Sequence, residues 1–284
     1  MPPRAARTPE ARPETGPTGR PRPQQLLLAL LGEMVLDRHP EPLPSRVFLD
    51  VLGRLGVTDV AARATLNRMT HRGLLTRGRQ GREAVYEISA AGRRVLRHGA
   101  GRIFSPEPFG RADGEWTLLS FTLPETHRDL RHQVRSRLAW AGFGPVRDGL
   151  WIAPGTVDPL EILGGLDLAE AAEASFGAFA GRPLPPTRLD LLVRRAWNLV
   201  EIRAAHEEFL GRWAGAAPEP GGALPALAAL LADWIRLLRT DPGLPATYLA
   251  EDWPAARSAR SFQRLHTCLA GPARAGFEAL IRGA

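Results

Sequence analysis

The feature that most constrains the fold lies in residues 24–98, where three helical patterns are followed by a β-hairpin pattern and a fourth helix. The first helix is expected in QQLLLALLGEMVLD, whose apolar residues recur at helical spacing. A second helix is expected from Ser45, a candidate N-cap, to Gly56, and a third from the N-cap Thr58 to Gly73. The segments LLTRGRQGREAVYEIS and AAGRRVLRHG then predict a hairpin and a closing helix. This order of elements is typical of a winged helix-turn-helix.

The third of these helices has two chemically different sides. At about 100° per residue, an apolar side is expected to face the core and carries Ala62, Leu66 and Met69. The opposite side carries residues that hydrogen-bond to base edges: Arg63, Asn67 and His71, flanked by Arg68. Arginine binds guanine and asparagine binds adenine through paired hydrogen bonds in the major groove. The pattern predicts a recognition helix; the alternative is a solvated basic face without a partner.

The turn of the predicted hairpin is rich in arginine and glycine. Its polar side chains are Arg77, Arg79, Gln80 and Arg82. Gly78 and Gly81 allow a tight turn and a close approach to another backbone. We expect this wing to contact phosphates or the minor groove of DNA, whereas the alternative is a plain soluble turn.

Positive charge is concentrated in the first third of the chain. The 37 basic residues are all arginines, and residues 1–23 hold five of them against two glutamates. Residues 24–98 hold twelve arginines against seven acids, and the remaining residues are nearly neutral. A locally basic region is expected to bind a polyanion. With seven prolines, residues 1–23 are predicted to form a disordered basic arm, which either contacts phosphates or is a solvated tail without a role.

The whole pattern predicts an α+β multidomain protein. Residues 24–100 form the winged helix-turn-helix, and a Gly- and Pro-rich linker follows near residues 101–114. The β-α-β-β-α-β order in residues 115–182 predicts a ferredoxin-like central domain. Residues 187–284 have helical periodicity and predict an all-α C-terminal domain.

Other sequence features favour a cytoplasmic protein that is not an enzyme. A single cysteine, Cys268, cannot form an intrachain disulfide, and neither a secretory signal nor an apolar run of about 20 residues is visible. The sequence lacks a phosphate-binding glycine loop, an HExxH motif and a GxSxG motif, so we expect no cofactor or metal. The first alternative is a metal-dependent nuclease built on the central domain with Asp113, Glu115 and Glu125. The second is an activator or structural chromatin protein.

Four segments carry a resemblance to a known family: VAARATLNRMTHRGLL, GLWIAP, RRAWNLVEIRAAHEEFL and DPGLPATYLAEDWPAARSARSFQRLH. Over residues 24–283 the chain resembles the PaaX-type repressors of phenylacetic acid degradation operons. The resemblance places Arg63, Thr65 and Arg68 at the Arg, Ser or Thr, and Arg positions of that family's recognition helix. Asn67 departs from the often bulkier residue there, so the operator is expected to differ.

The resemblance also implies a homodimer that binds a pseudo-palindromic operator in double-stranded DNA and is released by an acyl-CoA such as phenylacetyl-CoA. It implies a central domain like the CRISPR-associated adaptation endoribonucleases. The first strand of this domain ends in SFTLPE, without the aspartate that those nucleases have, which favours a structural or dimerising role.

Two clusters are candidates for effector binding, because coenzyme A needs cations for its phosphates and an apolar slot for its acyl group. They are Arg194, Arg195, Trp197 and Asn198, and Trp253, Arg257 and Arg260. We hypothesise that both face one cleft between the central and C-terminal domains. The alternative is that the tryptophans are core residues and the arginines are surface residues.

Overall fold

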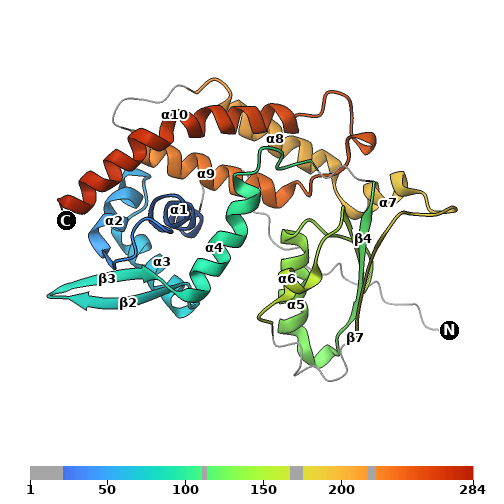
Figure 1. Cartoon of the computed structure of the whole chain (residues 1–284), viewed down its shortest axis with the longest axis horizontal. Coiled ribbons are helices and arrows are strands. Elements are labelled where there is room, and N and C mark those ends of the chain that lie inside the picture. Colours follow the sequence, from blue (N-terminus) through green and yellow to red (C-terminus); the bar gives the residue numbers. More distant parts are fainter. Residues whose placement is uncertain (1–21, 111–113, 167–174, 217–221, 284) are drawn as a thin grey trace, which may run out of the picture.

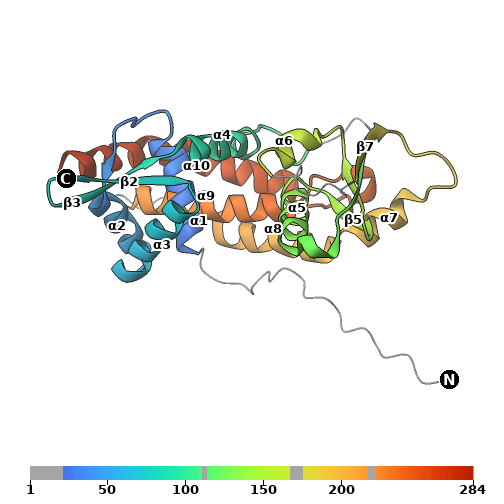
Figure 2. The same cartoon turned by 90° about the horizontal axis from the view of Figure 1, so that it is seen from below.

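The computed structural model describes residues 22–110, 114–166, 175–216 and 222–283. An N-terminal module lies at one end and a central sheet at the other, and long C-terminal helices run above the module toward the sheet (Figure 1). Seen from below, the molecule is elongated, with the helices and wing of the N-terminal module at one end (Figure 2). None of the helices in these ranges is both long and apolar enough to cross a membrane.

The N-terminal module has the expected order of elements. Its helices are α1 (Pro23–Leu30), continued by a π-helical turn (Leu31–Val35), α2 (Ser45–Arg54), α3 (Asp59–His71) and α4 (Ala90–Ile103). Its strands are β1 (Leu43–Pro44), β2 (Leu75–Gln80) and β3 (Glu83–Ile88), in the order β1-β3-β2. The expected N-cap at Ser45 is wrong by one residue, because the extended Pro44 precedes the helix and Ser45 is its first residue.

The central part is an antiparallel sheet with α5 and α6 on one face. Its strands are β4 (Trp116–Thr122), β5 (Gly144–Arg147), β6 (Leu150–Pro154) and β7 (Ser175–Gly181), in the order β5-β6-β4-β7. The helices are α5 (Arg128–Trp140) and α6 (Pro159–Leu163), with a short 3-10 turn, η2 (Glu125–His127), before α5. Alternate residues of β4 face α5, and Leu119 and Phe121 pack there against Val134 and Leu138. The strand order is that of the predicted ferredoxin-like fold.

The C-terminal part is helical, as expected. It consists of α7 (Leu189–Ala196), α8 (Leu199–Trp213), α9 (Ala223–Thr240), the 3-10 turn η3 (Ala246–Tyr248) and α10 (Ala255–Arg282). The sequence placed the end of the last helix near Leu269, which is wrong. The helix continues through Pro272 because Ala273 and Phe277 beyond it are completely buried.

One hydrophobic core joins the N-terminal module to the C-terminal helices. Leu30 of α1, Leu52 of α2 and Leu66 of α3 belong to the same buried cluster as Leu230 and Trp234 of α9. The central sheet has two smaller cores of its own, one against α5 and one against α7. The predicted domain boundaries remain predictions, but the first and last parts are packed as one unit.

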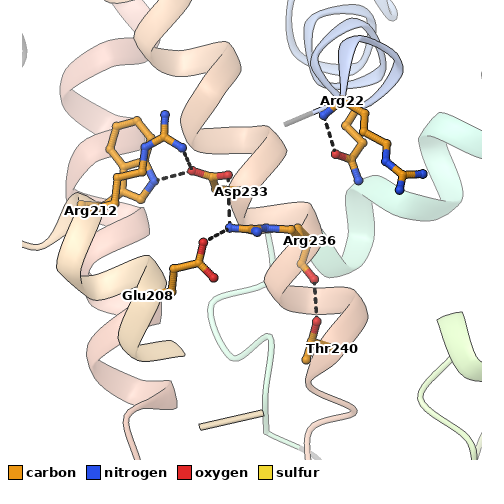
Figure 3. A network of polar contacts seen from close by, with 8 residues as sticks. Arg22, Glu208, Arg212, Asp233, Arg236 and Thr240 are labelled. Atoms are coloured by element: carbon orange, nitrogen blue, oxygen red, sulfur yellow. Dashed lines mark hydrogen bonds and ion pairs between the residues drawn. The ribbon is translucent and has the colours of Figure 1, made fainter. Parts of the chain in front are cut away.

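A buried carboxylate fixes α8 against α9 inside this unit. Asp233 Oδ2 of α9 accepts hydrogen bonds from Arg212 at 2.7 Å and from the indole N–H of Trp213 at 3.0 Å (Figure 3). Arg236 of α9 donates to Glu208 of α8 at 2.8 Å. Because a buried charge is tolerated only when it is paired, this network specifies how the two helices pack.

Candidate nucleic-acid interface

Helix α3 is held in place by its cap and by its apolar side. The Thr58 hydroxyl caps the helix by accepting the backbone N–H of Ala61 at 3.3 Å, as the sequence predicted. Ala62, Leu66 and Met69 are fully buried, which confirms the expected inward face. The orientation of α3 is therefore fixed by residues that cannot themselves reach a ligand.

The opposite side of α3 presents the predicted base-contacting residues. The side chains of Arg63, Asn67 and His71 are exposed. Within the described ranges, the side chains of Asn67 and His71 form no hydrogen bond or ion pair, and that of Arg63 forms only a 4.0 Å ion pair with Asp59. Because such a long pair between exposed groups contributes little, the donors of Arg63 stay available to another molecule.

Thr65 does not lie at this surface, which corrects the expectation that it contacts DNA. Its side chain is fully buried, and its hydroxyl donates to the Ala61 carbonyl at 2.7 Å. The same oxygen accepts a hydrogen bond from Arg68 Nη2 at 2.8 Å. Thr65 therefore orients the exposed Arg68 instead of contacting a partner directly.

The wing has the expected form. Strands β2 and β3 pair in register from Leu75 opposite Ile88 to Gln80 opposite Glu83, and Gly81 takes a positive φ of 61° in the turn. The predicted wing arginines are all exposed: Arg77, Arg79 and Arg82. The wing and the outer side of α3 together carry the cationic and amide side chains that a DNA site needs.

One contact between the wing and the helices has no signal in the sequence. Arg46, in the first turn of α2, forms an ion pair with Glu83, the first residue of β3, next to the turn of the wing. The two residues are 37 positions apart. No local pattern reveals such a pairing, and only the fold brings the two side chains together.

Helix α4 is attached directly to the end of α3. The Ser89 hydroxyl caps α4 by accepting the Gly92 N–H at 2.9 Å, and it donates to the carbonyl of Gly73, just after α3. Gly92 is required there, because a Cβ atom on it would lie 2.2 Å from the Leu74 carbonyl oxygen. A displacement of α4 is therefore transmitted to the α3–β2 junction.

Each part of this structure matches a family model. Residues 22–92 match a model described as PaaX-like protein, residues 110–177 match the PaaX protein central Cas2-like domain, and residues 197–279 match the PaaX-like protein C-terminal domain. The chain belongs to the PaaX family. The matches confirm the family that the sequence resembles and its mixed α and β architecture.

One solved structure supports the same fold over nearly the full chain. The PaaX-family chain is similar to uncharacterized protein Rv0674 from Mycobacterium tuberculosis, with 26% sequence identity and a TM-score of 0.54. The similarity covers 90% of this chain and 99% of that chain. No curated protein matches the chain in sequence.

Membership of the PaaX family identifies the protein as a transcription regulator and supports DNA binding. Members of the family are regulators rather than enzymes. In the described ranges, no three His, Cys, Asp or Glu residues are close enough to hold a metal ion. Of the residues named for the nuclease alternative, Glu115 directly precedes β4, Glu125 lies in η2 after that strand, and Asp113 is outside the described residues.

A buried Ser–His–Asp chain exists in this PaaX-family protein, between α8, α9 and α10. His206 Nε2 donates to Asp241 Oδ2 at 2.7 Å, and Ser258 Oγ lies 2.9 Å from His206 Nδ1. All three side chains are buried, with exposed fractions of 3% or less. A nucleophile must be reachable by its substrate, so this chain is a packing element that joins three helices.

The two predicted effector clusters occupy different surroundings. Trp197 packs against Trp116 of β4, with ring centroids 6.3 Å apart, and Asn198 caps α8 by accepting the Glu201 N–H at 3.3 Å. The prediction that these two residues line a ligand cleft is therefore not supported. Trp253 packs against His206 at 6.4 Å. The remaining members are exposed on α7 and α10: Arg194, Arg195, Arg257 and Arg260.

A cleft of about 550 Å³ lies elsewhere, between α4 and the side of the central part formed by the end of α5, α6 and the loop after β6. Side chains from both parts line it, among them His98, Arg102, Trp140, Thr156, Asp158 and Glu161. Its volume is within the range of about 300–1,000 Å³ typical of ligand pockets. A second cleft, of about 420 Å³, lies at the start of α5. The seven residues of the predicted effector clusters line neither cleft.

Proposed function

We propose that this PaaX-family protein is a sequence-specific transcriptional repressor that places α3 in the major groove of DNA. The observation that carries the proposal is the division of α3 into a buried apolar side and an exposed side with Arg63, Asn67 and His71. An exposed helix face with available guanidinium and amide donors fits the hydrogen-bonding edges of base pairs.

The residues of the interface have different roles in this proposal. Arg63 binds a guanine and Asn67 binds an adenine, while His71 and Arg68 contact the adjacent bases or backbone. Thr65 is a positioning residue that orients Arg68. The wing arginines Arg77, Arg79 and Arg82 bind phosphates or the minor groove, and the basic segment of residues 1–23 adds further phosphate contacts.

The proposal includes a homodimer. Two copies related by a two-fold axis would place two α3 helices in successive major grooves, about 34 Å apart, on a pseudo-palindromic operator. The central sheet is our candidate for the dimer contact, because its likeness to a Cas2-like domain is not accompanied by a metal-binding cluster in the described ranges.

We also propose that an acyl-CoA of the phenylacetyl-CoA type releases the repressor from DNA in the cytoplasm. The exposed arginines Arg194, Arg195, Arg257 and Arg260 remain candidates for binding its phosphates. The cleft beside α4 is an alternative location, since α4 is joined to the end of α3 through Ser89 and Gly92. A ligand there would act on the recognition helix through one element.

The first test is a gel shift with the protein's own upstream DNA at fixed salt, with and without phenylacetyl-CoA and other acyl-CoAs. Specific binding released by one thioester supports the whole proposal. Binding that no thioester releases would retain the DNA-binding role and overturn the effector. Cleavage of the DNA when magnesium is added would favour the nuclease alternative.

Substitutions then test the assignment of individual residues. Arg63→Ala and Asn67→Ala should each weaken operator binding by about 1–3 kcal/mol and relax base preference at one position. Arg79→Ala should weaken binding to all sequences alike and reduce its salt dependence. Arg274→Ala, on the exposed side of α10, is the matched control for loss of one positive charge. It should change neither the affinity for the operator nor the salt dependence of binding. Identical behaviour of Arg63→Ala and Arg79→Ala would contradict the assignment of α3 to the groove.

Three further variants locate the effector. Thr156→Arg would fill part of the cleft beside α4, whereas Arg195→Ala and Arg260→Ala remove cations from the predicted clusters. Loss of thioester-induced release in Thr156→Arg alone would assign the effector to the cleft. Loss in the arginine variants alone would assign it to the clusters.

A further inference from the structure

The first turn of α3 carries an apolar side chain that the fold does not use. Val60 is 79% exposed, whereas the two valines of the neighbouring helix α2, Val47 and Val51, are at most 2% exposed. A β-branched residue also forms helix less readily than alanine. Neither packing nor helix stability accounts for valine at this position.

Val60 lies in line with the predicted base-contacting residues. Arg63 follows it by three positions and Asn67 by seven, so the three side chains share one face of α3. Val60 belongs to the N-terminal end of the helix, and this is the end of a recognition helix whose side chains contact base edges. It therefore occupies a contact position although it carries no hydrogen-bonding group.

The major groove offers one apolar feature to such a side chain. Guanine, cytosine and adenine present donors and acceptors on that edge, and only thymine adds a methyl group, at C5. We propose that Val60 is a specificity-determining residue that packs on the 5-methyl group of one thymine in each operator half-site. This inference rests on the proposed placement of α3 in the major groove.

The spacing along the helix relates this thymine to the other contacted bases. From Val60 to Asn67 the helix rises about 10 Å, which corresponds to about three base-pair steps of DNA. A half-site should therefore contain a thymine read by Val60, a guanine read by Arg63 and an adenine read by Asn67 within a short run of neighbouring base pairs.

Replacement of thymine by deoxyuridine tests the inference, because it removes only the methyl group. Each thymine of the operator is replaced in turn, and the affinity of the wild-type protein is measured at fixed salt. One position per half-site should lose about fourfold in affinity, the ratio expected for one buried methyl group. With Val60→Ala the loss at that position should disappear, while the losses at other positions stay as in the wild type.

Two controls separate this inference from the proposed function. Val200→Ala, on α8, removes a valine of equal exposure (78%) and should leave the fourfold loss intact. If Arg63→Ala weakens operator binding but Val60→Ala shows the same deoxyuridine loss as the wild type at every thymine, the thymine contact is wrong and the DNA-binding role stands. If the wild type does not prefer its operator over unrelated DNA, the proposed function itself fails.

Discussion

The N-terminal module and the central sheet of this chain differ in how they are packed. The module shares one core with α8, α9 and α10, and its helix α3 packs on α1 and α2, which in turn contact α9. The central sheet buries its own residues against α5 and α7 and meets α4 across a cleft. The N-terminal module and the C-terminal helices thus form one packed unit, whereas the central sheet has separate cores.

Arg102, near the end of α4, links the two regions by hydrogen bonds. Its guanidinium donates to the carbonyl of Trp140, at the end of α5, and to that of Asp241, just after α9. Helix C-termini favour a cation, since their last carbonyls have no partner in the helix. Arg102 therefore joins α4 to the end of α5 and to the end of α9, at the edge of the cleft.

The largest expected effect follows from Trp234→Ala. This ring stacks on Phe262 of α10 at 4.4 Å and contacts Phe209 of α8, and its N–H donates to the Ile103 carbonyl at the end of α4. Its removal should lower the free energy of unfolding by about 3–5 kcal/mol. Hydrogen exchange should show α3 and α10 losing protection together while β4 keeps its protection. Loss of protection in α10 alone would contradict the single-unit description.

The counterpart in the other region is Leu138→Ala. This residue of α5 is fully buried among Leu119, Phe121 and Val134. Truncation should destabilise the central sheet by about 2–5 kcal/mol and raise exchange in α5 and β4. The amides of α3 should keep the exchange rates of the wild type. If α3 loses protection to the same extent as α5, the sheet is part of the same cooperative unit and the comparison fails.

Sequence periodicity was sufficient to predict the structure where a helix packs with one side against the core. It predicted the buried side of α3, the Thr58 cap and the hairpin of the wing, because these depend on local spacing. It failed where contacts come from distant segments. Phe109 was expected in a linker, but it packs between His206 and Trp234.

The site was predicted in the same uneven way. The exposure of Arg63 and Asn67 follows from helical phase, so it could be derived from sequence. The burial of Thr65 could not, because a polar side chain on the border between two faces is placed by its hydrogen bonds. The Arg46–Glu83 pair and the cleft beside α4 depend on tertiary packing and leave no trace in local patterns.

A smaller effect is expected from Gly92→Ala, which tests how closely α4 is joined to α3. The added methyl would meet the Leu74 carbonyl oxygen at 2.2 Å, so the start of α4 must shift. We expect a loss of about 1–3 kcal/mol in stability and weaker operator binding by a folded protein. Gly101→Ala on the same helix has open space around its Cβ and should be neutral or stabilising. Equal behaviour of the two variants in both assays would show that α4 does not constrain α3.

The smallest expected effect concerns an exposed ion pair in the N-terminal module. Arg97 of α4 donates to Asp37, 60 residues earlier, and this hydrogen bond holds the pKa of the Asp37 carboxyl below the ordinary aspartate value of 3.8. Since the pKa is lower in the folded state than in the unfolded state, the pair stabilises the fold above pH about 4, and this contribution is lost as the pH falls through the folded-state pKa.

Thermal denaturation between pH 7 and pH 3 tests this contribution. The melting temperature of Arg97→Ala should be slightly below that of the wild type at pH 7, and the difference should disappear at the acidic end. Arg188→Ala is the matched control near the central sheet, because Arg188 lowers the pKa of Asp190 in the same way but joins residues only two positions apart. Two residues this close in sequence also attract each other in the unfolded chain, so less of the Arg188–Asp190 attraction adds to the stability of the fold. The difference for Arg188→Ala should thus be the smaller of the two. If Arg188→Ala showed the larger difference in melting temperature, the Arg97–Asp37 contact would not be a significant stabilising contact of the N-terminal module.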